Sequence, residues 1–142
     1  MKKLLMIATV ALLAVACNKN QAAVKKLDGT WTATSFSVTE DGVTVDLIES
    51  GLITSATMTF GNCKLKDDEF CALTTTLETV FGTDTEADVY AVTDDGTTLQ
   101  TKDDAASTTI ETIEIVELSK TDCRLKETDE DGDITEITLT KN

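Results

Sequence analysis

The residue of this chain best placed for chemistry is Cys17, because the segment before it has the features of an export signal. Lys2 and Lys3 form a basic start, and residues 4–15 form an apolar run too short to span a bilayer. Ala14-Val15-Ala16 is a small-residue cleavage site placed directly before the cysteine. Cleavage there would leave a terminal thiol able to carry a diacylglycerol group. We predict a lipidated cysteine; the alternative is an ordinary signal peptide followed by a chance cysteine.

The predicted cleavage divides the chain into three parts. Residues 1–16 are the signal peptide, residues 17–26 a lipid-anchored flexible tether without a strand pattern, and residues 27–142 one folded domain. The residue after the cysteine is Asn18 and not the aspartate that favours inner-membrane retention in enteric bacteria. We therefore expect a lipid-anchored protein of the cell envelope, on the outer membrane. The sequence does not say whether it faces the periplasm or the cell surface.

The charge of the chain limits its partners. The formal net charge is −14, and removal of the signal peptide takes away two lysines and makes the protein more acidic. Such a surface repels nucleic acid phosphates and anionic lipid headgroups. We expect no nucleic acid partner, and membrane attachment through the acyl chains alone.

Residues for catalysis are scarce. The chain has no histidine, so the usual general base, zinc ligand and nucleophile partner are missing, and it has no phosphate-binding glycine loop. Residues 129–136 are acidic enough to suggest a calcium loop, but they are shorter than an EF-hand loop and fit a hairpin turn better. We predict a protein that is not an enzyme and that has no metal and no cofactor.

Three cysteines remain after Cys17. Outside the cytoplasm they allow one disulfide and one free thiol. We favour a bridge between Cys63 and Cys71, which flank a short hairpin, with Cys123 as a small buried residue. The alternative is that Cys71 and Cys123, which both occupy inward rows, are buried thiols.

The folded part reads as all-β. It has no proline, is rich in threonine, and alternates short runs of Val, Ile, Thr and aromatic residues with Asp-Gly and Asp-Asp clusters. Eight strands are predicted, at residues 30–38, 54–61, 70–80, 85–93, 97–102, 108–118, 121–128 and 133–140.

Several segments carry local expectations. The parity of apolar residues changes along the first strand, which predicts a bulge near Thr34. Residues 108–118 allow a helix as the alternative, but their apolar residues would scatter around it. Residues 46–51 fit one helical turn. Short links between successive strands favour an antiparallel up-and-down barrel over a sandwich, because closure removes both edges.

Alternation places one set of apolar side chains inside the barrel: Met58, Phe60, Leu73, Leu77, Leu99 and Leu125. These residues fill the interior as core or line a space for one small ligand.

The order of motifs resembles a known family. It comprises Lys-Leu-Asp-Gly-Thr-Trp at residues 26–31, Thr-Met-Thr-Phe-Gly at 57–61, Tyr-Ala-Val at 90–92, Asp-Gly-Thr-Thr-Leu at 95–99 and Ile-Glu-Ile-Val-Glu-Leu-Ser at 113–119. From Leu27 to about Thr140 the chain resembles the small lipocalin-like domains of bacterial lipoproteins of the Bacteroidetes type. The segment before Cys17 is similar to the bacterial lipobox, although Leu13 lies one place early.

The resemblance implies a lipocalin-like barrel in which Trp31 packs across the closed end and a basic side chain of a late strand covers it. Arg124, the single arginine, is the candidate for this cation–π contact; the alternative is an exposed partner of surrounding acids. The implied function is a non-enzymatic, lipid-anchored envelope protein that binds a small apolar or amphipathic molecule. The alternative is a solid barrel that serves as an interaction or inhibitor module for another envelope protein.

Overall fold

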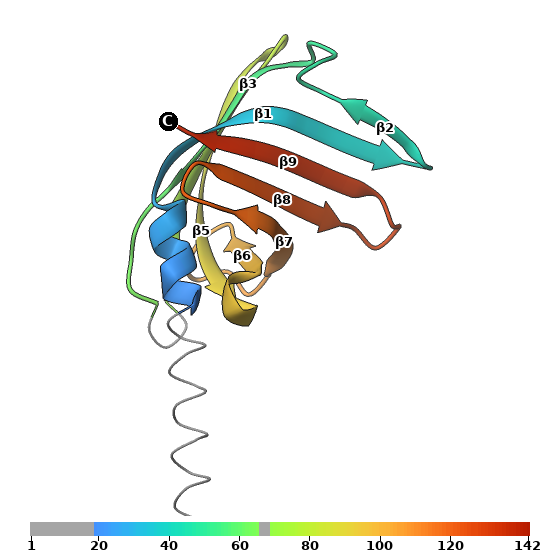
Figure 1. Cartoon of the computed structure of the whole chain (residues 1–142). Helices are drawn as coiled ribbons and strands as arrows, with labels where there is room; N and C mark the ends of the chain where they lie inside the picture. Colours follow the sequence, from blue (N-terminus) through green and yellow to red (C-terminus); the bar gives the residue numbers. More distant parts are fainter. Residues whose placement is uncertain (1–18, 66–68) are drawn as a thin grey trace, which may run out of the picture.

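The computed structural model describes residues 19–65 and 69–142 of the chain (Figure 1). The predicted signal peptide and Cys17 lie outside the described residues. In the part that is described, no helix has the length and apolar character needed to cross a membrane.

Nine strands form one antiparallel sheet in the described residues. They are β1 (Gly29–Glu40), β2 (Val43–Asp46), β3 (Ile53–Phe60), β4 (Cys71–Thr79), β5 (Gly82–Thr93), β6 (Thr98–Lys102), β7 (Glu111–Leu118), β8 (Asp122–Thr128) and β9 (Ile134–Lys141). β1 pairs with β9 from Trp31 to Thr39, and this pairing closes β1 and β3–β9 into an eight-stranded barrel. The predicted all-β barrel and its up-and-down order are therefore confirmed.

Two local predictions on the strands are confirmed. The register between β1 and β9 shifts between Ala33 and Ser35, where the bulge was expected. Residues 111–118 form β7 and not a helix, because their β-branched side chains pack on a pleated surface between two neighbouring strands.

The short strand β2 was not predicted. It pairs with the second half of β1 through a two-residue turn at Asp41 and Gly42, both of which have positive φ angles. An Asp-Gly pair at this place is the usual hairpin signal, since both residues tolerate that backbone conformation. Residues 47–50, where one helical turn was expected, form a hydrogen-bonded turn after β2.

The expected flexible tether is wrong for residues 19–26. Residues 19–27 form a helix (blue in Figure 1) whose Ala23, Val24 and Leu27 are buried in the barrel core. These positions fall on one helix face, so a segment too short to look amphipathic still presents an apolar stripe. The folded unit therefore includes residues 19–26, which lie before the expected boundary at residue 27.

Polar contacts fix this helix to the barrel. The Gln21 side chain donates to the Cys63 carbonyl at 2.8 Å and accepts from the Leu65 N–H at 2.9 Å. The Asn20 side chain accepts from the Gly96 N–H at 2.7 Å, in the turn between β5 and β6. The helix thereby closes one end of the barrel.

Candidate ligand pocket at the open end of the barrel

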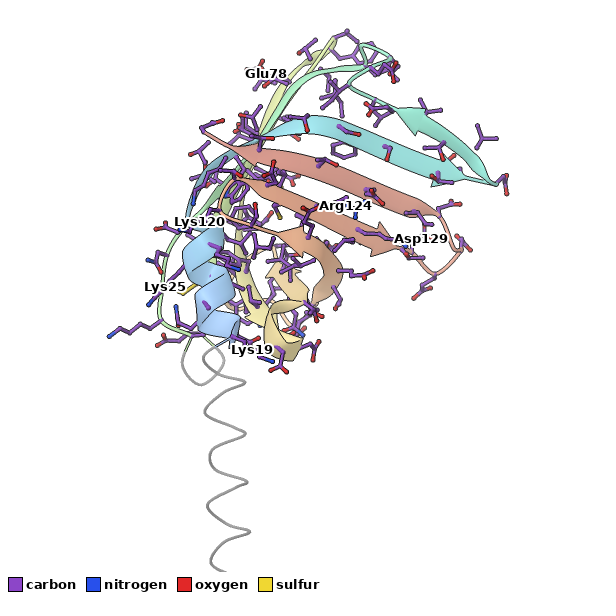
Figure 2. The ribbon with its side chains drawn as sticks, viewed as in Figure 1. Lys19, Lys25, Glu78, Lys120, Arg124 and Asp129 are labelled. Carbon is purple, nitrogen blue, oxygen red and sulfur yellow. A yellow bond between two sulfur atoms is a disulfide. The ribbon has the colours of Figure 1, made fainter. Side chains whose placement is uncertain are left out.

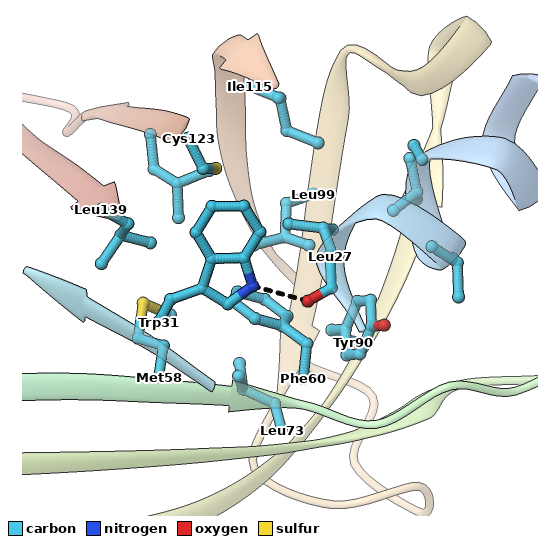
Figure 3. Packing of buried hydrophobic residues seen from close by; sticks show 14 of the residues in the cluster. Leu27, Trp31, Met58, Phe60, Leu73, Tyr90, Leu99, Ile115, Cys123 and Leu139 are labelled. Atoms are coloured by element: carbon cyan, nitrogen blue, oxygen red, sulfur yellow. Dashed lines mark hydrogen bonds between the residues drawn. The ribbon is translucent and has the colours of Figure 1, made fainter. Parts of the chain in front are cut away.

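The barrel interior has two levels, a packed core under the helix and a pocket at the opposite end. The core centres on Trp31, Phe60 and Tyr90, each at most 1% exposed, and Figure 3 shows it around the indole ring. Phe60 and Tyr90 meet edge to face with ring centroids 5.2 Å apart, and the Tyr90 hydroxyl donates to the Gly61 carbonyl at 2.7 Å. Within the described barrel this level is packed, and the pocket lies beyond it, toward the open end.

The open end contains a pocket of about 290 Å³. Its wall consists mostly of inward side chains of β1, β3, β4 and β9, together with two carboxylates of β5. The lining residues are Ala33, Phe36, Ala56, Met58, Thr75, Leu77, Asp84, Glu86, Ile137 and Leu139.

The pocket exists because β1 and β3 separate. They pair only over residues 29–32 of β1, and beyond the bulge β1 turns to pair with β2. Across the gap, the Leu47 N–H donates to the Phe36 carbonyl at 2.7 Å and the Ile53 N–H donates to the Leu47 carbonyl at 2.9 Å. The segment after β2 thus bridges the gap between β1 and β3, and its Leu47 and Ile48 pack against the core.

The six side chains expected along a ligand space divide between the two levels. Met58 and Leu77 line the pocket. The other four belong to the buried core and are not among the residues that line this pocket: Phe60, Leu73, Leu99 and Leu125.

Sequence reasoning missed the rest of the pocket wall. Ala33 and Ala56 are small residues whose size leaves room, and only the strand register brings Phe36 opposite Ile137. A signal was present in β5, where Asp84 and Glu86 share the parity of the inward Tyr90.

At the closed end a basic side chain covers the Trp31 ring, as expected, but it belongs to Lys141 and not to Arg124. The Trp31 Nε1–H donates to the Leu27 carbonyl at 2.6 Å (Figure 3), and the Lys141 ammonium lies 5.3 Å from the centroid of the Trp31 ring. The same ammonium donates to the Lys26 carbonyl at 3.0 Å. Lys141, in the last strand, therefore covers the ring and joins β9 to the helix.

The expected stacking of Arg124 on Trp31 is wrong. The Arg124 guanidinium lies 3.6 Å from the Glu136 carboxylate, and both side chains are more than a third exposed. Its neighbours Cys123 and Leu125 are buried, so strand alternation directs Arg124 outward.

The structure joins Cys63 to Cys71 by a disulfide, with the two Cα atoms 5.4 Å apart. The bond ties the segment after β3 to the start of β4, beside the N-terminal helix. Cys123 is a free thiol that is 1% exposed, and burial, with a smaller contribution from Glu117, raises its pKa to about 12.

Of the acidic residues 129–136, residues 129–133 connect β8 to β9 and residues 134–136 begin β9, as a hairpin requires. The Asp129 carboxylate accepts hydrogen bonds from the backbone N–H groups of Asp131 and Asp133, each at 2.9 Å. Over residues 19–65 and 69–142, no group of three His, Cys, Asp or Glu side chains is arranged to hold a metal ion.

Neither a protein-family model nor a curated protein sequence matches the chain. Among solved structures, the chain is similar to the siderocalin Ex-FABP, described as functioning through dual ligand specificities. The TM-score is 0.56 with 14% identity, over 82% of this chain and 74% of that one. A redesigned β-barrel matches with a TM-score of 0.49 and 17% identity, over 84% and 95% of the two chains, which is too weak to bear on the fold. The chain has the lipocalin-like barrel fold.

Proposed function

We propose that this protein is a non-enzymatic carrier that holds a small apolar or amphipathic molecule in the open-end pocket. The observation that carries the proposal is the pocket itself, which is lined mainly by apolar side chains within a lipocalin-like barrel. Its volume of about 290 Å³ lies near the lower end of the range for small-molecule sites. A short single chain or a flat fused-ring molecule fits this partly open space better than a lipid with several chains.

The test is ligand uptake by a lipid-free chain that begins at residue 18 and keeps every described residue. Native mass spectrometry of the untreated protein looks for a co-purified adduct, and the neutral dye Nile red measures uptake by fluorescence. Ala56→Phe places an aromatic ring in the pocket, so Nile red binding should be lost. Thr59→Phe is the matched control, because Thr59 is exposed on the outer face of the same strand.

Loss of Nile red binding in Ala56→Phe alone supports the carrier. Equal binding by both variants, or no uptake of dye or native ligand by the unmodified protein, contradicts it.

The proposal includes attachment to the envelope through acyl chains on Cys17, on the outer membrane. Lys19 and Asn20 begin the described helix and contact the turn at residues 94–96, at the closed end. An anchor two residues earlier would therefore leave the barrel from the closed end, with the pocket mouth at the other end. Cys17→Ser should abolish incorporation of labelled fatty acid and release the protein from membranes, whereas unchanged retention would contradict the anchor.

One observation favours a second function, the docking of another envelope protein on the rim of the mouth. Leu52, Val80 and Phe81 lie next to each other at this rim, and the Phe81 side chain is 92% exposed. Exposed apolar groups gathered beside a pocket are typical of contact sites. A photo-crosslinking amino acid at position 81 should form one discrete adduct in cells, and the same group at Lys120, exposed at the opposite end (Figure 2), should not.

A further inference from the structure

The open-end pocket has two chemically different walls. Phe36, Ala56, Met58 and Ile137 form an apolar surface contributed by β1, β3 and β9. The opposite wall is the inward row of β5, and the strand register places Asp84 opposite Leu77 and Glu86 opposite Thr75. An apolar ligand would satisfy the first wall and leave the second without a partner.

The two carboxylates have no partner among the described residues. The two ion pairs found there are Lys19 with Asp95 and Arg124 with Glu136, and neither involves Asp84 or Glu86. No side-chain hydrogen bond is formed by either group within that part of the chain. A carboxylate that faces an apolar cavity without a counter-charge is an attractive position for a cation.

The interior of the described barrel also lacks positive charge near the pocket. Lys102, Arg124 and Lys126 alternate with the buried Thr101, Cys123 and Leu125, so their side chains are directed outward. Lys141 is occupied at the closed end by the Trp31 ring and the Lys26 carbonyl. A cationic ligand would therefore meet no repulsion from these side chains.

The next acid along the β5 row shows how burial affects negative charge deeper in the barrel. Asp88 lies in the same row as Glu86 and opposite Leu73. Its pKa is raised, first by partial burial and second by the carboxylate of Asp103. Negative charge is therefore disfavoured at this point of the row, one inward position beyond Glu86.

We infer that the pocket takes a small amphipathic cation, with its apolar body against β1, β3 and β9 and its cationic group against Asp84 and Glu86. This inference rests on the proposed carrier function and names the chemical class of its ligand. A primary alkylammonium with one short chain is the simplest molecule of this class.

The test compares three probes with the same eight-carbon chain: octylammonium, octanol and octyl sulfate. Each displaces Nile red from the lipid-free chain that begins at residue 18. Octylammonium should bind about fivefold more tightly than octanol, the advantage of a partly exposed charge pair, and octyl sulfate should bind most weakly. The advantage of octylammonium should shrink in 0.5 M salt, while octanol binding should not weaken.

Variants distinguish the effect of the pocket carboxylates on ligand binding from the effect of the overall negative charge of the protein. The double variant Asp84→Asn with Glu86→Gln should bring octylammonium to the affinity of octanol. Asp84→Asn combined with Glu86→Lys gives this wall a net positive charge and should reverse the preference toward octyl sulfate. Glu78→Gln is the matched control, because Glu78 is exposed on the outer face of the adjacent strand at the same end of the barrel (Figure 2).

Retention of the octylammonium preference in Glu78→Gln and its loss in the double variant support the inference. Equal binding of octylammonium and octanol by the unmodified protein overturns it, and so does equal loss in Glu78→Gln and the double variant. In both of these cases octanol and Nile red still bind and the carrier proposal stands. If none of the probes binds, the carrier proposal fails and this inference fails with it.

Discussion

Replacement of Leu27 by alanine tests whether residues 19–27 are part of the barrel. The Leu27 side chain is fully buried beside Trp31, and its backbone carbonyl accepts the indole hydrogen bond. The substitution keeps the carbonyl and removes only the side chain. The change in stability therefore reports the packing of the helix against the core.

The expected loss is about 3 kcal/mol in the free energy of unfolding. Leucine-to-alanine changes at fully buried sites cost ~2.7–5 kcal/mol, and the lower part of this range applies because a barrel end relaxes more easily than its middle. With a urea dependence of ~1.5 kcal/mol per molar, the unfolding midpoint should fall by about 2 M. Trp31 is the single tryptophan, so its fluorescence follows unfolding without an added label.

Lys25→Ala provides the control. Lys25 is exposed on the same helix (Figure 2), and alanine has a high helix propensity, so the free energy of unfolding should change by less than ~0.5 kcal/mol. Equal unfolding midpoints for the two variants would refute the packing of the helix against the core and would support a flexible tether at residues 19–26.

Three further results are expected for the lipid-free chain. Cys63→Ala opens the disulfide, whose cysteines are 8 residues apart, and should lower the free energy of unfolding by about 2 kcal/mol in guanidinium titrations. A midpoint that does not move would contradict a stabilising bridge. Lys141→Met removes the cation over Trp31 and should cost about 1 kcal/mol, against less than ~0.5 kcal/mol for Arg124→Met. A larger stability loss in Arg124→Met than in Lys141→Met, measured by urea titration, would indicate that Arg124 covers the Trp31 ring instead. Cys123, with its pKa raised to about 12, holds about one thiolate in ten thousand at pH 8, so Ellman's reagent should react only after unfolding. Rapid reaction of the native protein would show that this thiol is accessible.

The strands were predictable because their signal is local. Alternation and turn residues located all eight barrel strands to within a few residues, and the change of parity along β1 revealed its bulge. β2 was missed because only four residues separate Asp41-Gly42 from the next turn, which gives too little sequence for a pattern.

Two contacts at the closed end could not be predicted from the sequence. The helix over residues 19–27 is short and begins among polar residues, so its stability comes from docking Val24 and Leu27 into the barrel and not from its own propensity. Lys141 meets Trp31 because closure places them side by side in register. Family resemblance implied a basic side chain of a late strand, which Lys141 is, but Arg124 was chosen as the candidate although strand alternation directs it outward.

The pocket, too, was predictable only in the part that depends on local sequence and not in the part that depends on closure of the barrel. Parity alone marks Asp84 and Glu86 as inward, but it does not say whether the barrel is filled at their level. That depends on where β1 leaves β3 and on the small side chains of Ala33 and Ala56, which line the same space only after the barrel has closed. Inward acids are tolerable at an open mouth, where solvent reaches them, and the pKa of Asp88, the acid of this row nearest to the buried Tyr90, is already raised chiefly by burial. The position of charged inward residues along a strand is therefore itself a marker of where a small barrel changes from core to pocket.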